Sequence, residues 1–297
     1  MAQVKALDVV EWGGLKHRVA DLVVNPNAEF YDNLAQTPER DRDITRPGVL
    51  WSGASFTTQA CGSGTAGAPP DAHLLLNACG MRASVVAATS VTYTLDPAFT
   101  HTPLDIDCYR GNQYLISADN CTGTCEWVFT PGAPCLENWT FSGIYQAPTD
   151  ASGTAAMGAS ARPPICKGLT ATFAGSTVCM KEARISLGNV YPDPDRCIAG
   201  TNGIQDPALS DRDVTFSAVI RLPLVASLDI WGMITAETPF AMHIVLGGVA
   251  GNITTYDIEG YAMETPAPSE SEGFHEITVR CRMSWLSGDT QLTIAYT

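Results

Sequence analysis

The chain has 297 residues and a formal net charge of −14, and only 16% of its residues are charged. The acidic balance argues against a surface that binds nucleic acid, which needs clustered Lys and Arg, and against docking on an anionic membrane. No stretch reaches the roughly 18 uncharged apolar residues of a membrane-spanning helix. So low a charged fraction, against an average near ~25%, is typical of a chain that hides surface in an assembly. The N-terminus lacks the pattern of a signal peptide, so we expect cytosolic synthesis.

In chain order, residues 1–45 carry charges, Pro and Asn with little periodicity, so we expect a loosely held N-terminal arm. A short helix is predicted near residues 71–79. Asp71 can cap its first N–H groups, Leu74–Leu76 form its apolar face, and Gly80 can adopt the left-handed conformation that ends a helix.

Most of the remaining chain alternates apolar and polar residues at period two, as half-buried strands do. The clearest runs are 90–95, 124–129, 138–145, 278–285 and 291–296. The sequence therefore predicts a mainly β fold. Because the last run reaches the end of the chain, we expect a neighbouring strand to pair with it.

Residues 151–167 are rich in small residues and Pro, so they are predicted to be a linker. They separate two β-rich blocks, residues 46–150 and 168–297. Residues 140–148 and 256–266 share a pattern in which a strand runs through a Gly and an aromatic residue toward a Pro. This shared pattern suggests that the two blocks are related by duplication.

The sequence contains no catalytic motif of the nucleophile-elbow, zinc-protease or Walker A type, so we assign no catalytic residue, no cofactor and no enzymatic activity. Cys121 and Cys125, with Cys135 further on, have a spacing that zinc sites use, but no second close Cys/His pair follows. We therefore expect no metal site. For the ten cysteines, disulfides within or between subunits and buried thiols stay open as alternatives.

One segment carries a more specific signal. Residues 47–80 contain a strand, a Gly-Ser-Gly-rich loop, a Pro-Pro dipeptide and a short helix ending in Leu75-Leu76-Asn77-Ala78-Cys79-Gly80. This order resembles the major tail tube protein of long-tailed (siphovirus-like) bacteriophages. Three further segments are similar to that family in order and spacing: 90–94, 107–115 and 140–148. The resemblance covers about residues 18–150 and is weaker after residue 168, and the chain departs from single-domain members in its length and number of cysteines.

The resemblance implies tandem tail-tube-type β-sandwich domains that contribute strands to an inner barrel. It implies a virion protein, assembled in the host cytoplasm, whose rings stack head to tail through N-terminal arms, loops and C-terminal strands. The stacked rings would form the tail tube, the conduit for DNA ejection into the host. Its partners would be other copies of itself, the tail terminator and the tape measure protein, while DNA passes without specific binding.

The suspected duplication predicts the ring symmetry. Single-domain members of the family are understood to form six-fold rings, so a chain with two sandwiches needs three copies for the same channel. We therefore predict a trimeric, pseudo-six-fold ring. A true hexamer, with the second block outside the tube, is the competing arrangement.

The acidic balance suggests what faces the channel, because Asp and Glu repel phosphates and keep DNA from binding. Glu126, Asp257 and Glu259 occupy the polar faces of alternating strands and are the predicted lumen-facing residues.

An alternative function is a β-sandwich carbohydrate-binding module or an adhesin or fibre subunit, which would expose Trp in a groove. Trp127, Trp139 and Trp285 instead lie on alternating apolar faces and are predicted to be core. A β-rich glycan hydrolase is a third possibility, which would need two facing carboxylates.

Overall fold

The computed structural model describes residues 8–31, 45–98, 100–158, 161–168, 170–192, 194–283 and 291–297. The chain is mainly β, with 54% of residues in strands and 5% in helix, which confirms the fold class predicted from the alternating pattern. The sheets are antiparallel, and they do not close into a barrel within the part of the chain that is described. No helix in those ranges is long and apolar enough to cross a membrane.

Sheet A, the longer of two sheets, is built around the sixteen-residue strand β8. Its main order is β3-β4-β9-β8-β13-β16-β20-β19, and β10, β7, β1 and β2 extend it around the first part of β8. The strands are β1 (Val9–Trp12), β2 (Leu15–His17), β3 (Ala20–Tyr31), β4 (Arg46–Gln59), β7 (Leu104–Arg110), β8 (Tyr114–Phe129), β9 (Leu136–Tyr145), β10 (Thr149–Asp150), β13 (Met180–Ser186), β16 (Thr215–Arg221), β19 (Pro268–Ser271) and β20 (Phe274–Arg282).

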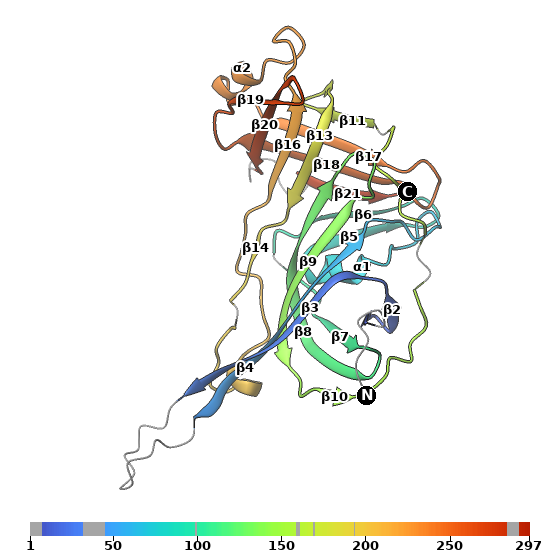
Figure 1. Cartoon of the computed structure of the whole chain (residues 1–297), viewed down its shortest axis with the longest axis vertical. Helices are drawn as coiled ribbons and strands as arrows, with labels where there is room; N and C mark the ends of the chain where they lie inside the picture. Colours follow the sequence, from blue (N-terminus) through green and yellow to red (C-terminus); the bar gives the residue numbers. More distant parts are fainter. Residues whose placement is uncertain are drawn as a thin grey trace.

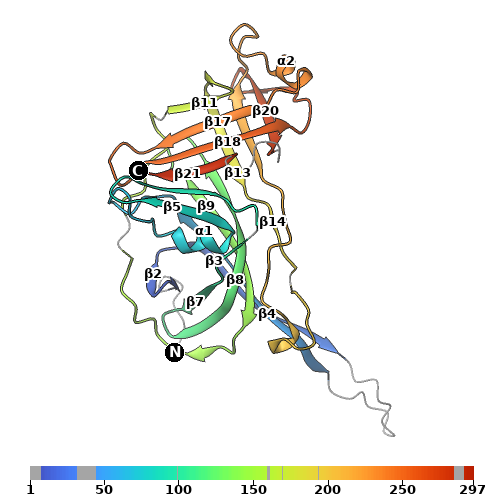
Figure 2. The ribbon, with the colours of Figure 1, turned by 180° about the vertical axis from the view of Figure 1, so that it is seen from behind.

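Sheet B has the order β12-β11-β17-β18-β21-β6-β5. Its strands are β5 (Met81–Val86), β6 (Ser90–Leu95), β11 (Thr170–Phe173), β12 (Ser176–Thr177), β17 (Phe240–Leu246), β18 (Thr254–Ala262) and β21 (Leu292–Tyr296). They run across the direction of the sheet A strands in both views (Figures 1 and 2). The end of β18 also pairs with β20, so the two sheets are joined at one corner.

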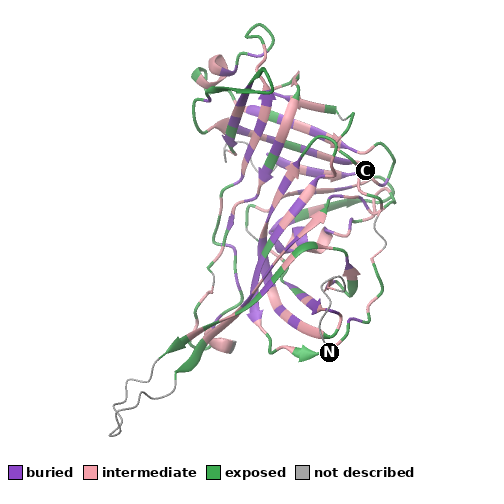
Figure 3. Cartoon of the chain, viewed as in Figure 1, coloured by how far each residue is buried: buried purple, intermediate pink, exposed green. Residues whose placement is uncertain are grey.

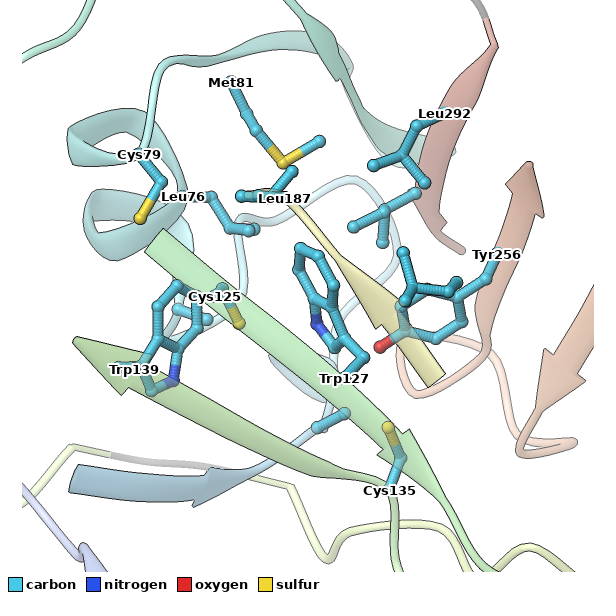
Figure 4. Packing of buried hydrophobic residues seen from close by; sticks show 14 of the residues in the cluster. Leu76, Cys79, Met81, Cys125, Trp127, Cys135, Trp139, Leu187, Tyr256 and Leu292 are labelled. Carbon is cyan, nitrogen blue, oxygen red and sulfur yellow. The ribbon is translucent and has the colours of Figure 1, made fainter. Parts of the chain in front are cut away.

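Aromatic side chains fill the space between the two sheets. Trp127 of β8 is fully buried, and its ring lies 6.4 Å from that of Trp139 and 6.2 Å from that of Tyr256, measured between centroids. Figure 4 shows Trp127 between these two rings, so it bridges sheet A and sheet B. Inward and outward residues alternate along the strands (Figure 3), which is the period-two pattern of the sequence. The core is therefore a sandwich interior held largely by aromatic burial.

The predicted helix is present as α1 (His73–Ala78), between β4 and β5. Leu75 and Leu76 are buried, and Gly80 has φ +71°, as expected of the residue that stops the helix. The predicted cap is wrong: Ala72 occupies the N-cap and makes no side-chain hydrogen bond there. A second helix, α2 (Ile230–Thr235), begins after Asp229, which caps it. It was not predicted, because a helix of about two turns is too short to show a helical period in the sequence.

The N-terminal arm expected over residues 1–45 stays a prediction; within that range the described residues 8–31 form β1, β2 and β3. β1 pairs with β7, roughly a hundred residues along the chain, and it buries Val10 and Trp12. Local periodicity could not show this pairing, because the two strands lie so far apart in the sequence. β3 pairs with β4, and the β3–β4 ribbon projects from the sandwich (Figure 1). Residues 1–7 and 32–44 lie outside the described residues.

The two predicted blocks share both sheets. β8 pairs with β13 in sheet A, and β6 pairs with β21 in sheet B. The described part of the predicted linker is irregular and is hydrogen-bonded to earlier parts of the chain: Lys16 N donates to Ala156 O at 2.9 Å, and Cys166 N donates to Ala133 O at 2.8 Å. The division into two domains stays a prediction, but any such domains are joined by strand pairing rather than by the linker alone.

A repeated order of elements runs through both blocks. The series β3-β4-α1-β5-β6-β7-β8 and β13-β16-α2-β17-β18-β19-β20 each give a pair in sheet A, a helix, a pair in sheet B and a further pair in sheet A. The sequence likeness between residues 140–148 and 256–266 does not follow this repeat. It falls on β9 in sheet A and β18 in sheet B, which occupy different places in the two series.

Candidate assembly surfaces

The structure brings two of the three predicted lumen residues together. Asp257 and Glu259 alternate with buried residues of β18 and point away from the core, on the outer face of sheet B. Glu126 alternates with buried residues of β8 and lies on the outer face of sheet A. Because the core lies between the sheets, Glu126 is on the opposite side of the sandwich from the other two. The three residues cannot line one continuous surface within a single chain.

Hydroxyl groups, rather than acids, dominate the outer face of sheet B. Strand register places the following residues in one row across the sheet: Thr172, His243, Asp257, Thr293, Thr94 and Arg82. A second row holds Thr170, Val245, Thr255, Ala295, Thr92 and Ser84. Thr is favoured in strands and its hydroxyls pair across them, so these rows suit an exposed sheet face.

One of the two acidic residues on this face has a hydrogen-bonding partner. Asp257 Oδ1 lies 2.5 Å from His243 Nδ1, and the two side chains are 52% and 38% exposed. Glu259 is half-buried and lies opposite Ala241 on β17. The face is therefore neutral to weakly acidic.

The outer face of sheet A differs, because ion pairs cross it. Arg184 lies 3.8 Å from Glu126, and Asn138 Nδ2 donates to the same carboxylate at 3.4 Å. Arg282 lies 2.7 Å from Asp213 in a second exposed pair. Exposed pairs of this kind are worth about 0–1 kcal/mol each, so they shape the surface more than they stabilise it.

The β3–β4 ribbon exposes apolar side chains. Beyond β9, the first residues of β4 pair only with β3 among the described strands, so this part is two strands wide. Phe30 is 64% exposed and Tyr31 is 52% exposed. β3 also leaves one backbone edge without a strand partner in the described part of the chain. An apolar surface next to an open edge is a template for pairing with another chain.

Sheet B ends in open edges on both sides. β5 pairs only with β6 among the described strands, and its Val85 and Val86 are 53% and 52% exposed. At the other end, β11 pairs with β17 and with the two-residue β12. The sheet can therefore be extended at either side.

A pocket of about 660 Å³ lies between β2, the end of β4, residues 157–158 and residues 161–163. On its wall, His17 stacks on Trp12 with ring centroids 3.6 Å apart. Burial lowers the pKa of His17, although Asp71, whose Oδ2 lies 4.0 Å from Nδ1, acts in the opposite direction. Sequence reasoning missed this pocket, because its walls come from segments that are distant in the chain.

Glu137 also lines the pocket and is the least expected residue of the interior. Its side chain is 2% exposed, and its carboxylate accepts hydrogen bonds from Thr58 Oγ1 at 2.8 Å and Trp127 Nε1 at 3.3 Å. Burial raises the pKa of Glu137 to about 7. The sequence carries a signal for the burial of Glu137, because this residue occurs at the same alternating positions as Trp139 and Phe141.

All ten cysteines carry free thiols, so of the two alternatives left open by the sequence this chain shows no internal disulfide. Burial raises the pKa of Cys108 and Cys281 to about 12, so these thiols are poor nucleophiles. Across the described ranges, no group of three or more His, Cys, Asp or Glu side chains could hold a metal ion.

No protein-family model matches this chain, and no curated protein sequence matches it. The resemblance to tail tube proteins therefore stays a prediction that depends on the residues quoted above.

Proposed function

We propose that this protein is a non-enzymatic structural subunit of the tail tube of a long-tailed bacteriophage. In this proposal it polymerises into stacked rings through which DNA is ejected, and its further partners are the tail terminator and the tape measure protein. The observation that carries the proposal is sheet B, which takes strands from both blocks, turns a hydroxyl-rich face to solvent and ends in open edges.

The edges of sheet B suit a ring. A strand edge with exposed apolar residues is a hazard in a monomer and is removed when a neighbouring edge pairs with it. If β5 of one copy pairs with the edge formed by β11 and β12 of the next, the sheets of successive copies continue into one another, and a closing rotation yields a barrel. The hydroxyl rows then face the channel, and Glu126 lies on the outside.

The proposed lining suits the passage of DNA. Gripping phosphates requires clustered Lys and Arg. The two hydroxyl rows hold Arg82 at the edge and His243 beside Asp257, with Thr and Ser over most of the remainder. Such a surface offers DNA no cluster of cations, and the net charge of −14 adds repulsion at longer range.

The β3–β4 ribbon suits contact along the tube axis. It projects away from the sandwich (Figure 2), and Phe30 and Tyr31 lie near the end of its described part. A ring that places this ribbon against the next ring forms a head-to-tail contact, which repeats without closing and builds a tube.

The repeated order of elements supports a trimeric ring, because three copies place six repeats around one channel. The competing arrangement is a hexamer, in which the second block lies outside the tube. The sharing of sheet B between the blocks favours the trimer, since β21 of the second block lies directly beside β6 of the first.

Electron microscopy of the purified protein tests the proposal. We expect rings or tubes in negative stain, and three-fold modulation of six lobes in end-on views. Strict six-fold density would replace the trimer with the hexamer. Monomers at every concentration, with measurable binding to glycans, would favour the carbohydrate-binding alternative.

A matched pair of variants sharpens this test. Val86→Lys places a charge at the β5 edge and should abolish rings while leaving the monomer folded. Val249→Lys changes an exposed valine outside the named strands, 72% exposed, and should leave assembly unchanged. Equal assembly of both variants would contradict a ring contact at β5.

A further inference from the structure

The connection between β13 and β16, described at residues 187–192 and 194–214, is a long loop that runs toward the β3–β4 ribbon. In Figures 1 and 2 it leaves the sandwich, descends beside sheet A and returns. β14 (Asn189–Val190) pairs with β15 (Asp211–Arg212) along its sides, and the short 3-10 helix η2 (Thr201–Gly203) lies near its far end. In the repeated order of elements, this loop occupies the place of the connection between β3 and β4.

The near end of the β13–β16 loop is fixed to the sandwich by hydrogen bonds. Asn189 Nδ2 donates to the carbonyl oxygens of Cys79 and Gly123, both at 2.8 Å. Arg212 Nη2 donates to Gly80 O at 2.9 Å, and its Nε donates to Asn189 Oδ1 at 2.8 Å. The near end of the loop is therefore anchored to the backbone that follows α1 and to β8.

The far end of the loop contacts the β3–β4 ribbon. The guanidinium of Arg196 forms an ion pair with Glu29 of β3 and donates to the hydroxyl of Tyr31 at 3.3 Å. Tyr31 in turn donates to Glu29 at 2.9 Å, and the hydrogen bonds from Tyr31 and Arg196 lower the pKa of Glu29. Asn202 Nδ2 also donates to Tyr145 O, at the end of β9, at 2.9 Å.

We propose that the β13–β16 loop is a brace that fixes the direction of the β3–β4 ribbon, with Arg196 as its positioning residue. A two-stranded ribbon is marginally stable by itself, so its direction depends on contacts at its sides. The loop supplies them from a base that is hydrogen-bonded to the sandwich. A pre-oriented ribbon loses less conformational freedom when it binds another copy, so the brace also promotes assembly; this second half rests on the proposed function.

Hydrogen exchange of the soluble monomer tests the brace without reference to assembly. In Arg196→Ala, peptides covering residues 26–31 and 46–50 should exchange about threefold faster or more, while β8 and β9 are unchanged. Asn202→Gly removes the hydrogen bond that holds the loop to Tyr145 of β9, next to the ribbon, and keeps the left-handed backbone at φ 57°; it should act in the same direction on the ribbon. Arg280→Ala, which breaks an exposed pair with Glu264 on sheet A, is the control. Exchange in Arg196→Ala equal to that of the control would overturn the brace.

Charge exchange tests whether the ion pair itself carries the effect. Glu29→Arg and Arg196→Glu should each loosen the ribbon, and the double variant should return exchange to within about twofold of the wild type. Failure of the double variant to restore protection would overturn Arg196 as the positioning residue.

The assembly half of the inference has its own readout. Arg196→Glu should slow the light-scattering rise of tube formation about tenfold, because each new contact must first order the ribbon. The double variant should recover the rate. A loosened ribbon that assembles at the wild-type rate would overturn the link to assembly. If the variants loosen the ribbon but the wild type itself never assembles, the brace stands and the proposed function is overturned.

Discussion

The interior of the sandwich and its projecting parts differ in where their apolar side chains find contacts. Between the sheets, Trp127 and Tyr256 contact each other across the core and are fully buried. On the β3–β4 ribbon and the β5 edge, residues such as Phe30 and Val86 are more than half exposed. The interior is thus completed by this chain alone, whereas the projecting parts are suited to contacts outside it. Substitutions in the interior should change stability, and those in the projecting parts should change assembly.

The largest expected effect is on the core. Trp127→Ala leaves a cavity between the two sheets and should lower the free energy of unfolding by about 3–5 kcal/mol. Urea unfolding followed by circular dichroism measures this loss. Trp231→Ala, at a half-buried position of α2, is the matched control and should cost clearly less. Equal losses for the two variants would contradict the picture of Trp127 as the bridge between the sheets.

The next effect concerns Glu137 and pH. The folded-state pKa is about 7 and the ordinary value is 4.5, so the folded protein holds a proton that the unfolded chain has released. Stability from this group is therefore fully present below about pH 4.5 and is lost as pH rises through 7, by about 3 kcal/mol in all.

Glu137→Gln should remove this slope, because the amide carries no charge at any pH. Unfolding free energies measured between pH 5 and 8 should fall for the wild type and stay level for the variant, after both are compared with Glu126→Gln. The Glu126 control carries an exposed carboxylate on the same sheet. A parallel pH dependence of wild type and Glu137→Gln would show that Glu137 is not the group responsible.

Glu137 also shows what local pattern can and cannot predict. The alternation over residues 138–145 correctly predicted a strand with Trp139 facing inward, and Glu137, one residue before that run, lies on the same face. The pattern gave no hydrogen-bonding partner, because Thr58 comes from a strand 79 residues away. The mainly β class, α1 and strands such as β6, β9, β20 and β21 followed from local signals. The sharing of the two sheets did not, since pairs such as β6 with β21 join strands that lie far apart in the sequence.

The candidate surfaces were predicted only in part for the same reason. Asp257 and Glu259 share a strand, so alternation was enough to place them together. Glu126 lies on another strand, and its side of the sandwich depends on how the sheets stack, which no local pattern contains. The β3–β4 ribbon was not predicted, because buried and exposed residues do not alternate regularly along β3.

The ribbon gives the third prediction. Phe30→Ser should change the free energy of unfolding by less than about 0.5 kcal/mol, because the side chain is already exposed. It should nevertheless reduce tube formation, measured by light scattering and microscopy, if the ribbon contacts the next ring. Leu224→Ser, at a residue 78% exposed outside the named strands, is the control for loss of an exposed apolar side chain. A loss of stability without a loss of assembly would reverse the assignment of Phe30.

The last prediction concerns the outer face of sheet B. Asp257→Asn removes the ion pair with His243, whose two side chains are 52% and 38% exposed. Water and salt screen such a pair, so the variant should differ from the wild type by less than about 1 kcal/mol at low salt, and the difference should vanish near 0.5 M salt. Urea unfolding at the two salt concentrations measures this. A larger loss that persists in high salt would mean that Asp257 is a structural residue of sheet B. Asp257 would then stabilise the fold, as Trp127 does. The outer face of sheet B could no longer be treated as a surface whose charges can be changed without loss of the fold.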